Sequence, residues 1–163
     1  MAFPVFISFI IFLRIGELLL ARHNERWLLQ NGAIEYGKQH YPLIVALHVL
    51  FLVSLILEYY SQQTHTYSIF LLVVYFALLA FKTWVIVSLG KFWNTKIYRI
   101  HNMSLVKKGP YKYFKHPNYL VVIAEIAVIP LAFHLNYTAT IFTLLNIVML
   151  FVRVKEENKA LQN

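Results

Sequence analysis

Residues 67–89 read YSIFLLVVYFALLAFKTWVIVSL, an apolar run of 23 residues whose single charge is Lys82. At a helical rise of about 1.5 Å per residue, this run can cross the roughly 30 Å of hydrocarbon in a bilayer. Its apolar residues are continuous and do not form the spaced stripe of an amphipathic helix. The segment therefore predicts a membrane-spanning helix.

Four more apolar runs accompany this segment. Two precede it, at 3–21 and 41–60, and each is long enough to span a bilayer. Two follow it, at 119–134 and 137–152, with about 16 residues each. Only the residues around Asn136 separate the last two runs, so we expect them to form a short helical hairpin. This hairpin either just spans the bilayer or enters it and returns, and both of its ends lie on one face of the membrane. The sequence predicts an all-α integral membrane protein with about five transmembrane helices.

The composition agrees with a membrane protein and argues against several kinds of functional site. Of the 163 residues, 60% are hydrophobic, against roughly half in a soluble domain. Cysteine is absent, which excludes a disulfide framework, a thiolate metal site and a cysteine nucleophile. The seven histidines show neither His-x-x-x-His nor His-x-x-Glu spacing, so we expect no metal site. Without an internal repeat or a Gly/Ser linker, the chain is expected to form one domain over 1–163.

The positive charges are distributed unevenly, and their distribution predicts the topology. Lys and Arg number 15 against 7 acidic residues, which gives a net charge of +8. Outside the apolar runs, three lie in 22–40, seven in 91–118 and three from 153 onward, whereas 61–66 and the turn around Asn136 have none. By the positive-inside rule, we expect the N-terminus outside and both basic loops and the C-terminus in the cytoplasm.

The basic segment 91–119 contains no acidic residue and ends in two turn motifs. Attraction to anionic membrane lipids would explain the charge alone, and we expect no nucleic-acid partner. The sequence GPY at 109–111 predicts a turn. In KHPNY at 115–119, Pro117 fits the first turn of the following helix. His116 is thereby held at the mouth of the hairpin, beside a helix N-terminus that can receive an anionic group.

The far end of the hairpin carries RVKEE at 153–157. Arg153 and Glu157 are four residues apart, so a cation and a carboxylate share one helix face. A solvated helix end could carry the same pair. The hairpin, however, returns these residues to the side of His116 and Tyr119. We therefore expect imidazole, phenol, guanidinium and carboxylate groups to meet at one membrane surface.

In GPY, HPNY and the terminal Arg-x-x-Glu-Glu, placed in this order around a short hairpin, the chain resembles the isoprenylcysteine carboxyl methyltransferase family. The resemblance covers about the last 75 residues. FWNTKI at 92–97 and the Arg14-x-x-Glu17 pattern of the first run are similar to bacterial members. The resemblance implies a methyltransferase of the bacterial plasma membrane that uses S-adenosylmethionine, with three spans in 1–90 and a cofactor-binding loop, hairpin and helix end in 91–163.

The resemblance also implies roles for individual residues. Arg153 is the implied catalytic residue and binds the acceptor. Two positions depart from the family. Lys115 replaces an arginine, which keeps the positive charge but loses the guanidinium's two-pronged hydrogen bonding. Val121 stands where many members have glycine. The implied cofactor-binding residues are Met103, Ser104, Leu105, Val106, Tyr111, His116, Pro117, Asn118, Tyr119 and Glu157.

The implied reaction has modest requirements. An ionised carboxylate, with a reference pKa of about 4, is already a nucleophile at neutral pH, so the enzyme needs to orient it and exclude water. A planar guanidinium such as that of Arg153 can hold a carboxylate through two hydrogen bonds. The expected acceptor is a lipophilic, membrane-dissolved carboxylate or acidic enol or phenol, such as an isoprenylcysteine-like or alkylpyrone-like molecule. Alternatives are an NADPH-dependent membrane reductase of the sterol-reductase type, which shares His-Pro-x-Tyr, and a small transporter or interaction protein.

Ionisable residues inside the spans are costly and are therefore functional candidates. Arg14 and Glu17 are three residues apart, so we expect them to pair. Lys82 and Glu125 lie at similar depth on different helices, where either an ion pair or a substrate-channel role fits. His48 and His134 are expected to be helix histidines with satisfied hydrogen bonds.

Overall fold

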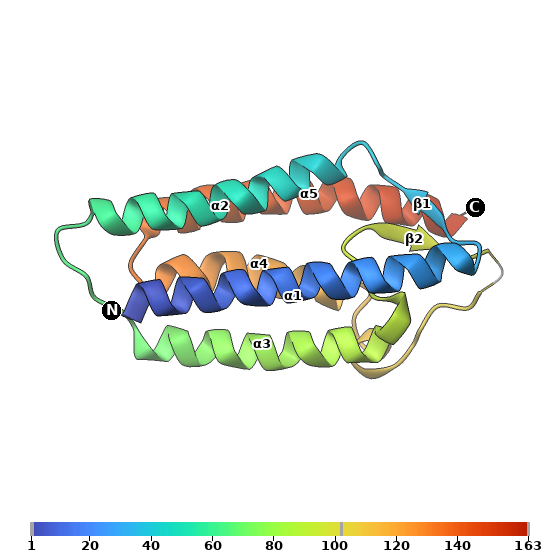
Figure 1. The fold of residues 1–163 in the computed structure, drawn as a ribbon, viewed down its shortest axis with the longest axis horizontal. Coiled ribbons are helices and arrows are strands. Elements are labelled where there is room, and N and C mark those ends of the chain that lie inside the picture. Colours follow the sequence, from blue (N-terminus) through green and yellow to red (C-terminus); the bar gives the residue numbers. More distant parts are fainter. Residues whose placement is uncertain (1, 102, 163) are drawn as a thin grey trace.

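The computed structural model describes residues 2–101 and 103–162 and contains five α-helices that run along a common axis (Figure 1). This confirms the number of helices predicted from the sequence. Two short 3-10 turns, η1 (Gly90–Phe92) and η2 (Gly109–Lys112), lie between the third and fourth helices. The helices are α1 (Ala2–Gln30), α2 (Tyr41–Ser61), α3 (Ile69–Leu89), α4 (Pro117–Leu131) and α5 (Asn136–Gln162).

Four helices, α1, α2, α3 and α5, are long and apolar enough to cross a bilayer. The chain is thus an integral membrane protein. The 15-residue α4 rises about 22 Å, less than the hydrocarbon thickness. The apolar run 137–152 forms the first part of the 27-residue α5, which continues through Arg153 and Glu157 as expected. Similarly, α1 continues beyond residue 21 to Gln30.

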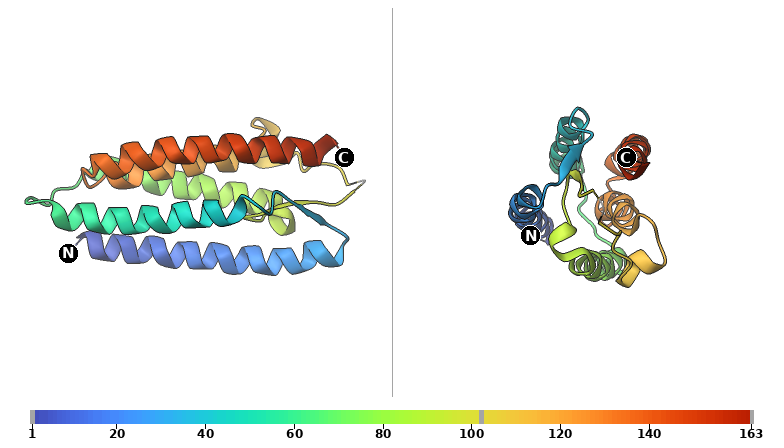
Figure 2. Two further views of the ribbon diagram at one scale, coloured as in Figure 1. Left: turned by 90° about the horizontal axis from the view of Figure 1, so that it is seen from above. Right: turned by 90° about the vertical axis from the view of Figure 1, so that its right-hand side faces the viewer.

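The helices pack around an interior to which all five contribute. Viewed end-on in Figure 2, α4 lies between α3 and α5, α2 packs beside α5, and α1 lies across from α4 and α5. We call the end with the α2–α3 and α4–α5 connections the turn end. The opposite end, with the strands and 3-10 turns, is the basic end, because the charged segments 22–40, 91–118 and 153–159 lie there. The assignment of the basic end to the cytoplasm stays a prediction from charge.

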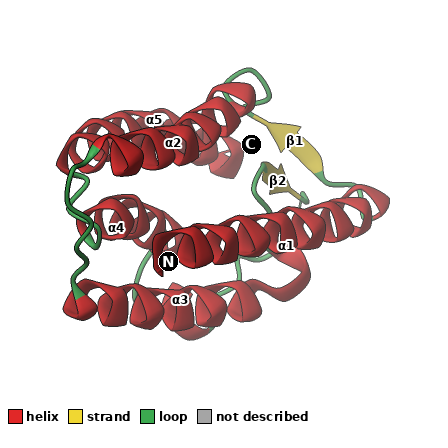
Figure 3. Ribbon diagram, turned by 60° about the vertical axis from the view of Figure 1, so that its left-hand side comes forward, coloured by secondary structure: helices red, strands yellow, loops and turns green. Residues whose placement is uncertain are grey.

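Two short strands at the basic end were not anticipated from the sequence. β1 (Ile34–Tyr36) and β2 (Ile97–Arg99) form an antiparallel pair (Figure 3) with Glu35 opposite Tyr98. Three residues are too few to show a strand period. The pair joins the loop after α1 to the loop after α3.

The densest aromatic packing lies at the turn end. Phe3 stacks on Tyr59 with ring centroids 3.8 Å apart and meets the edge of Phe133 at 5.1 Å. The carboxylate of Glu58 accepts hydrogen bonds from the backbone N–H groups of Tyr137 and Thr138, at 3.0 and 2.7 Å, and so satisfies free donors at the start of α5. One end of the bundle is therefore closed by packing.

The α4–α5 connection is a tight turn. The fourth helix ends at Leu131, and His134 follows it with φ of 58°, in the left-handed region. The expectation that His134 lies in a helix was therefore wrong. His48 does lie in α2, and its Nδ1 hydrogen-bonds the carbonyl of Ile44 at 2.8 Å.

Candidate active site

Two cavities meet in the half of the molecule toward the basic end. The loop cavity, of about 330 Å³, is bounded by the segment after β2, the start of α4 and the end of α5. The helix cavity, of about 310 Å³, lies inside the bundle and is lined mainly by apolar side chains. The residues that line both cavities are Trp93, Asn94, Asn118, Tyr119 and Arg153.

At this junction, Tyr119 links a cation to a carboxylate. Arg153 donates from Nε to the Tyr119 hydroxyl at 2.9 Å, and that hydroxyl donates to Glu157 Oε2 at 2.6 Å. The guanidinium of Arg153 lies over the Tyr119 ring, 5.4 Å from its centroid. The ring of His116 stacks on Tyr119 at 5.2 Å, and its Nδ1 is 3.3 Å from Glu157. The four groups expected to meet at one surface do so.

Most of the sequence-predicted site residues line the loop cavity. Pro117 does not line it: this residue is buried in the first turn of α4 and sets where the helix begins. Val121 is buried and lines neither cavity, so its departure from glycine does not change their walls. Lys115 lines the loop cavity and donates to Asn158 Oδ1 at 2.8 Å. The predicted residues on the wall are Met103, Ser104, Leu105, Val106, Tyr111, His116, Asn118, Tyr119, Arg153 and Glu157.

Several polar atoms near the junction are buried without a partner in the described part of the chain. They include Nε2 of His116, Oδ1 of Asn118 and Nε1 of Trp93. Unpaired buried polar groups are costly. Burial and the nearby Glu157 raise the pKa of the Tyr111 phenol, so it keeps its proton at neutral pH. The loop cavity therefore offers hydrogen-bonding groups of both kinds.

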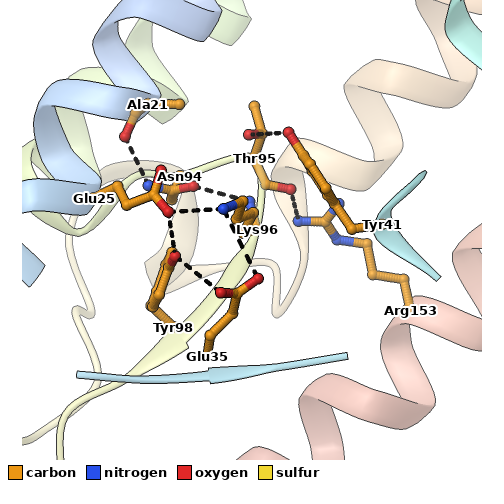
Figure 4. Close-up of polar contacts among 9 residues, drawn as sticks. All are labelled: Ala21, Glu25, Glu35, Tyr41, Asn94, Thr95, Lys96, Tyr98 and Arg153. Atoms are coloured by element: carbon orange, nitrogen blue, oxygen red, sulfur yellow. Dashed lines mark hydrogen bonds and ion pairs between the residues drawn. The ribbon is translucent and has the colours of Figure 1, made fainter. Parts of the chain in front are cut away.

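The orientation of Arg153 depends on a segment that sequence reasoning did not include in the site. Its Nη2 donates to the backbone carbonyl of Thr95 at 2.6 Å, and the Thr95 hydroxyl is 3.2 Å from that of Tyr41 (Figure 4). Only Nη1 of this guanidinium makes no hydrogen bond within 2–101 and 103–162. One edge of the guanidinium is therefore fixed and the other is available.

The segment around Thr95 is in turn held by α1. Asn24 donates from Nδ2 to the carbonyls of Trp93 at 2.8 Å and Gly90 at 3.2 Å. Asn94 donates to the carbonyl of Ala21 at 2.8 Å. Asn24 is only 3% exposed. The sequence signal was the Arg22-x-Asn24 pattern after the first apolar run, which resembles bacterial members of the family, but the partners of Asn24 are backbone carbonyls, which no side-chain pattern reveals.

A charged cluster secures the same segment from the sheet side (Figure 4). Lys96 Nζ lies 2.7 Å from Glu25 and 3.9 Å from Glu35. Tyr98 donates to Glu25 at 2.5 Å. The bond to Glu25 raises the pKa of Lys96, and burial with the same carboxylate raises the pKa of Tyr98. Both groups keep their protons at neutral pH and continue to donate.

Within the bundle, four charged residues form one connected cluster, which we call the ion cluster. Arg14 pairs with Glu17 and with Glu125, each at 2.9 Å. Lys82 lies 3.2 Å from Glu125 and also contacts Glu17. Both ion pairs considered from the sequence are present. The cross-links between them join α1, α3 and α4. In the described residues, no group of three or more potential ligands could hold a metal ion.

The chain is similar to a known protein family and to bacterial proteins. The model of the Isoprenylcysteine carboxyl methyltransferase (ICMT) family matches residues 69–163. "Uncharacterized protein YpbQ" of Bacillus subtilis (strain 168) is 43% identical over 162 residues, covering 98% of this chain and 96% of that protein. An "Uncharacterized protein" of Haemophilus influenzae is 31% identical over 158 residues, covering 94% and 91%. No solved structure matches.

Proposed function

The chain belongs to the isoprenylcysteine carboxyl methyltransferase family, and on that premise we propose that it transfers a methyl group from S-adenosylmethionine to an oxygen of a lipophilic acceptor dissolved in the membrane. The observation that carries this proposal is the junction of the two cavities at Arg153 and Tyr119. One cavity has polar side chains among its walls and lies at the loop end of the helices, and the other is a more apolar space inside the bundle. Two substrates of different polarity could therefore meet at one guanidinium.

The loop cavity is suited to S-adenosylmethionine. Its volume lies in the range of small-molecule sites. The Glu157 carboxylate can accept from the cofactor's ammonium group or from its ribose hydroxyls, and Oδ1 of Asn118 is a buried acceptor without a partner among the described residues. The segment 103–106 would border the cofactor along one side. These features match a polar cofactor that carries hydroxyl and amino groups.

When bound, S-adenosylmethionine supplies an electrophilic methyl group, so an ionised oxygen acceptor requires orientation and a dry site more than it requires a base. Arg153 would hold the acceptor oxygen through its free Nη1 edge. Thr95 and Tyr119 would fix the guanidinium while this occurs. The walls of the helix cavity would exclude water from the acceptor side.

The proposed acceptor is a carboxylate or an acidic enol or phenol with a long apolar portion, such as an isoprenylcysteine-like or alkylpyrone-like molecule. Its apolar portion would occupy the helix cavity, whose lining includes Ile10, Leu47 and Phe51. We propose that the acceptor arrives from the bilayer and the cofactor from the basic end, on the cytoplasmic side.

The proposal is tested by calorimetric titration of the detergent-purified protein with S-adenosylhomocysteine, with NADPH as the control for the reductase alternative. We expect saturable binding of S-adenosylhomocysteine only. Glu157→Ala and His116→Ala should weaken it by about tenfold or more, because each removes a polar group of the loop cavity. Arg153→Ala should abolish methyl transfer and leave cofactor affinity nearly unchanged. Binding of NADPH, or of neither compound by folded protein, would contradict the proposal.

A further inference from the structure

The helix cavity has a polar belt partway along its apolar length. Besides Lys82 of α3 and the polar side chains near Arg153, its lining includes four polar residues that lie on three helices. Arg14 and Glu17 come from α1, His48 from α2 and Asn146 from α5. We call these four residues the polar belt. They lie apart from Arg153, and the proposed methyl transfer does not use them.

The distance from the polar belt to Arg153 follows from two helices independently. On α4, Glu125 contacts Arg14 and Tyr119 contacts Arg153. These α4 residues are six positions apart, or about 9 Å along the helix axis. On α5, Asn146 and Arg153 are seven positions apart, or about 10 Å. The polar belt therefore lies about 9 to 10 Å deeper in the bundle than the proposed methyl-transfer position.

Groups of the polar belt remain available for hydrogen bonding. Asn146 is 2% exposed, and its Nδ2 has no partner in the described part of the chain. The Arg14 side chain keeps 23% exposure although it forms one ion pair within α1, with Glu17, and one with Glu125 of α4. In His48, Nδ1 must donate, because its partner is the Ile44 carbonyl, which leaves Nε2 as an acceptor. The belt offers both donors and acceptors.

The charge balance limits what the polar belt can bind. The ion cluster contains two cations and two carboxylates, so it is already neutral. An additional charged group at this depth would be uncompensated in a low-dielectric interior. A neutral hydroxyl or carbonyl oxygen could pair with Asn146 and Arg14 at no such cost. Beyond the belt toward the turn end, the lining is apolar again and includes Ile10, Phe51 and Leu52.

We propose that the polar belt is a second recognition site for the acceptor, which binds a neutral hydroxyl or carbonyl group on its chain about 9 Å from the methylated oxygen. The inference rests on the proposed function and adds a specificity element to it. The preferred acceptor would have an ionised oxygen at Arg153, then a neutral oxygen at the belt, then an apolar end.

The test uses wild-type protein and a series of long-chain carboxylic acids with one hydroxyl group moved a carbon at a time along the chain. KM and kcat for methyl transfer are measured for each acid and for the unsubstituted chain. We expect KM to fall by about tenfold when the hydroxyl is about 9 Å from the carboxylate, with kcat nearly unchanged. An unsubstituted chain with a KM as low as that of every hydroxylated acid would overturn the inference.

Two variants of α5 separate recognition from packing. Asn146→Leu should remove the preference for the hydroxylated acid and leave S-adenosylhomocysteine affinity intact. Thr143→Val is the matched control, because the Thr143 hydroxyl is also buried and has no partner within the described chain, but this residue lines neither cavity. The control should keep the preference. A preference that persists in Asn146→Leu would also overturn the inference.

The outcomes distinguish this inference from the proposed function. Methyl transfer to every acid without a preference for any hydroxyl position would overturn the polar belt as a recognition site and leave the methyltransferase proposal standing. Failure of folded protein both to bind S-adenosylhomocysteine and to methylate any acid would overturn both.

Discussion

Tyr119 joins the two charged groups of the candidate site through one hydroxyl, which accepts from Arg153 and donates to Glu157. Its ring also stacks on His116. A phenylalanine would keep the ring and lose both hydrogen bonds. We expect Tyr119→Phe to reduce kcat by about tenfold or more, because Arg153 loses a fixed partner, and to weaken S-adenosylhomocysteine binding, because Glu157 loses another.

Methyl-transfer kinetics and calorimetry measure these two effects separately. Tyr113→Phe is the matched control, since Tyr113 lies nearby in sequence but is 73% exposed. The control should leave kcat and affinity unchanged. If Tyr119→Phe behaves like Tyr113→Phe, the hydroxyl does not position the site.

Glu125 is the more buried of the two carboxylates of the ion cluster, and it contacts both cations. Glu125→Gln would leave an uncompensated positive charge in the bundle, and we expect it to lower the free energy of unfolding by about 3 kcal/mol or more. Glu156→Gln is the control, because the Glu156–Lys159 pair is on the surface, where solvent screens it, and its loss should change the free energy of unfolding much less. Thermal unfolding in detergent measures both. Equal shifts in the two variants would show that the cluster contributes no more than a surface pair.

At the level of elements, α1 lines the loop cavity at Leu28 and also supports the site indirectly. Its Asn24 holds the backbone of the segment whose Thr95 carbonyl fixes Arg153. We expect Asn24→Ala to lower kcat at least several-fold and to leave S-adenosylhomocysteine affinity nearly unchanged. Asn31→Ala is the matched control, since Asn31 also donates to a carbonyl, that of Trp27, but is exposed. Methyl transfer and calorimetry test the pair, and equal loss of kcat in both variants would contradict this role.

The elements also show which features a sequence can reveal. Apolar runs gave the helices of the bundle, and Pro117 marked the start of α4 correctly. The apolar run 137–152 marks only the first part of α5, because the last part of this helix is polar while its backbone hydrogen bonding continues. The role of Thr95 was missed because it acts through its backbone carbonyl. Motif residues were identifiable from their chemistry, but backbone contacts and cross-links between helices required the fold.

On the scale of the whole molecule, packing and function are divided between the two ends. The aromatic cluster around Phe3 closes the turn end, while the loop cavity lies at the basic end and the helix cavity extends from it into the bundle. The short α4 begins at Pro117, directly after His116, and does not extend to the basic end of the bundle. The preceding loop can therefore fold over that end. This arrangement gives a polar loop cavity direct contact with an apolar interior at Arg153.

The orientation of these two ends across the membrane can be measured directly, because the chain contains no cysteine and provides a clean background. Thr64→Cys places a thiol at the exposed turn end, and Lys112→Cys places one at the exposed basic end. Thirteen basic residues outside the apolar runs lie toward the basic end, so the positive-inside rule assigns it to the cytoplasm. A membrane-impermeant maleimide should label Thr64→Cys in intact cells and Lys112→Cys only after the membrane is opened. The reverse pattern would place the loop cavity outside the cell, away from cytoplasmic S-adenosylmethionine, and would contradict both the topology and the proposed route of the cofactor.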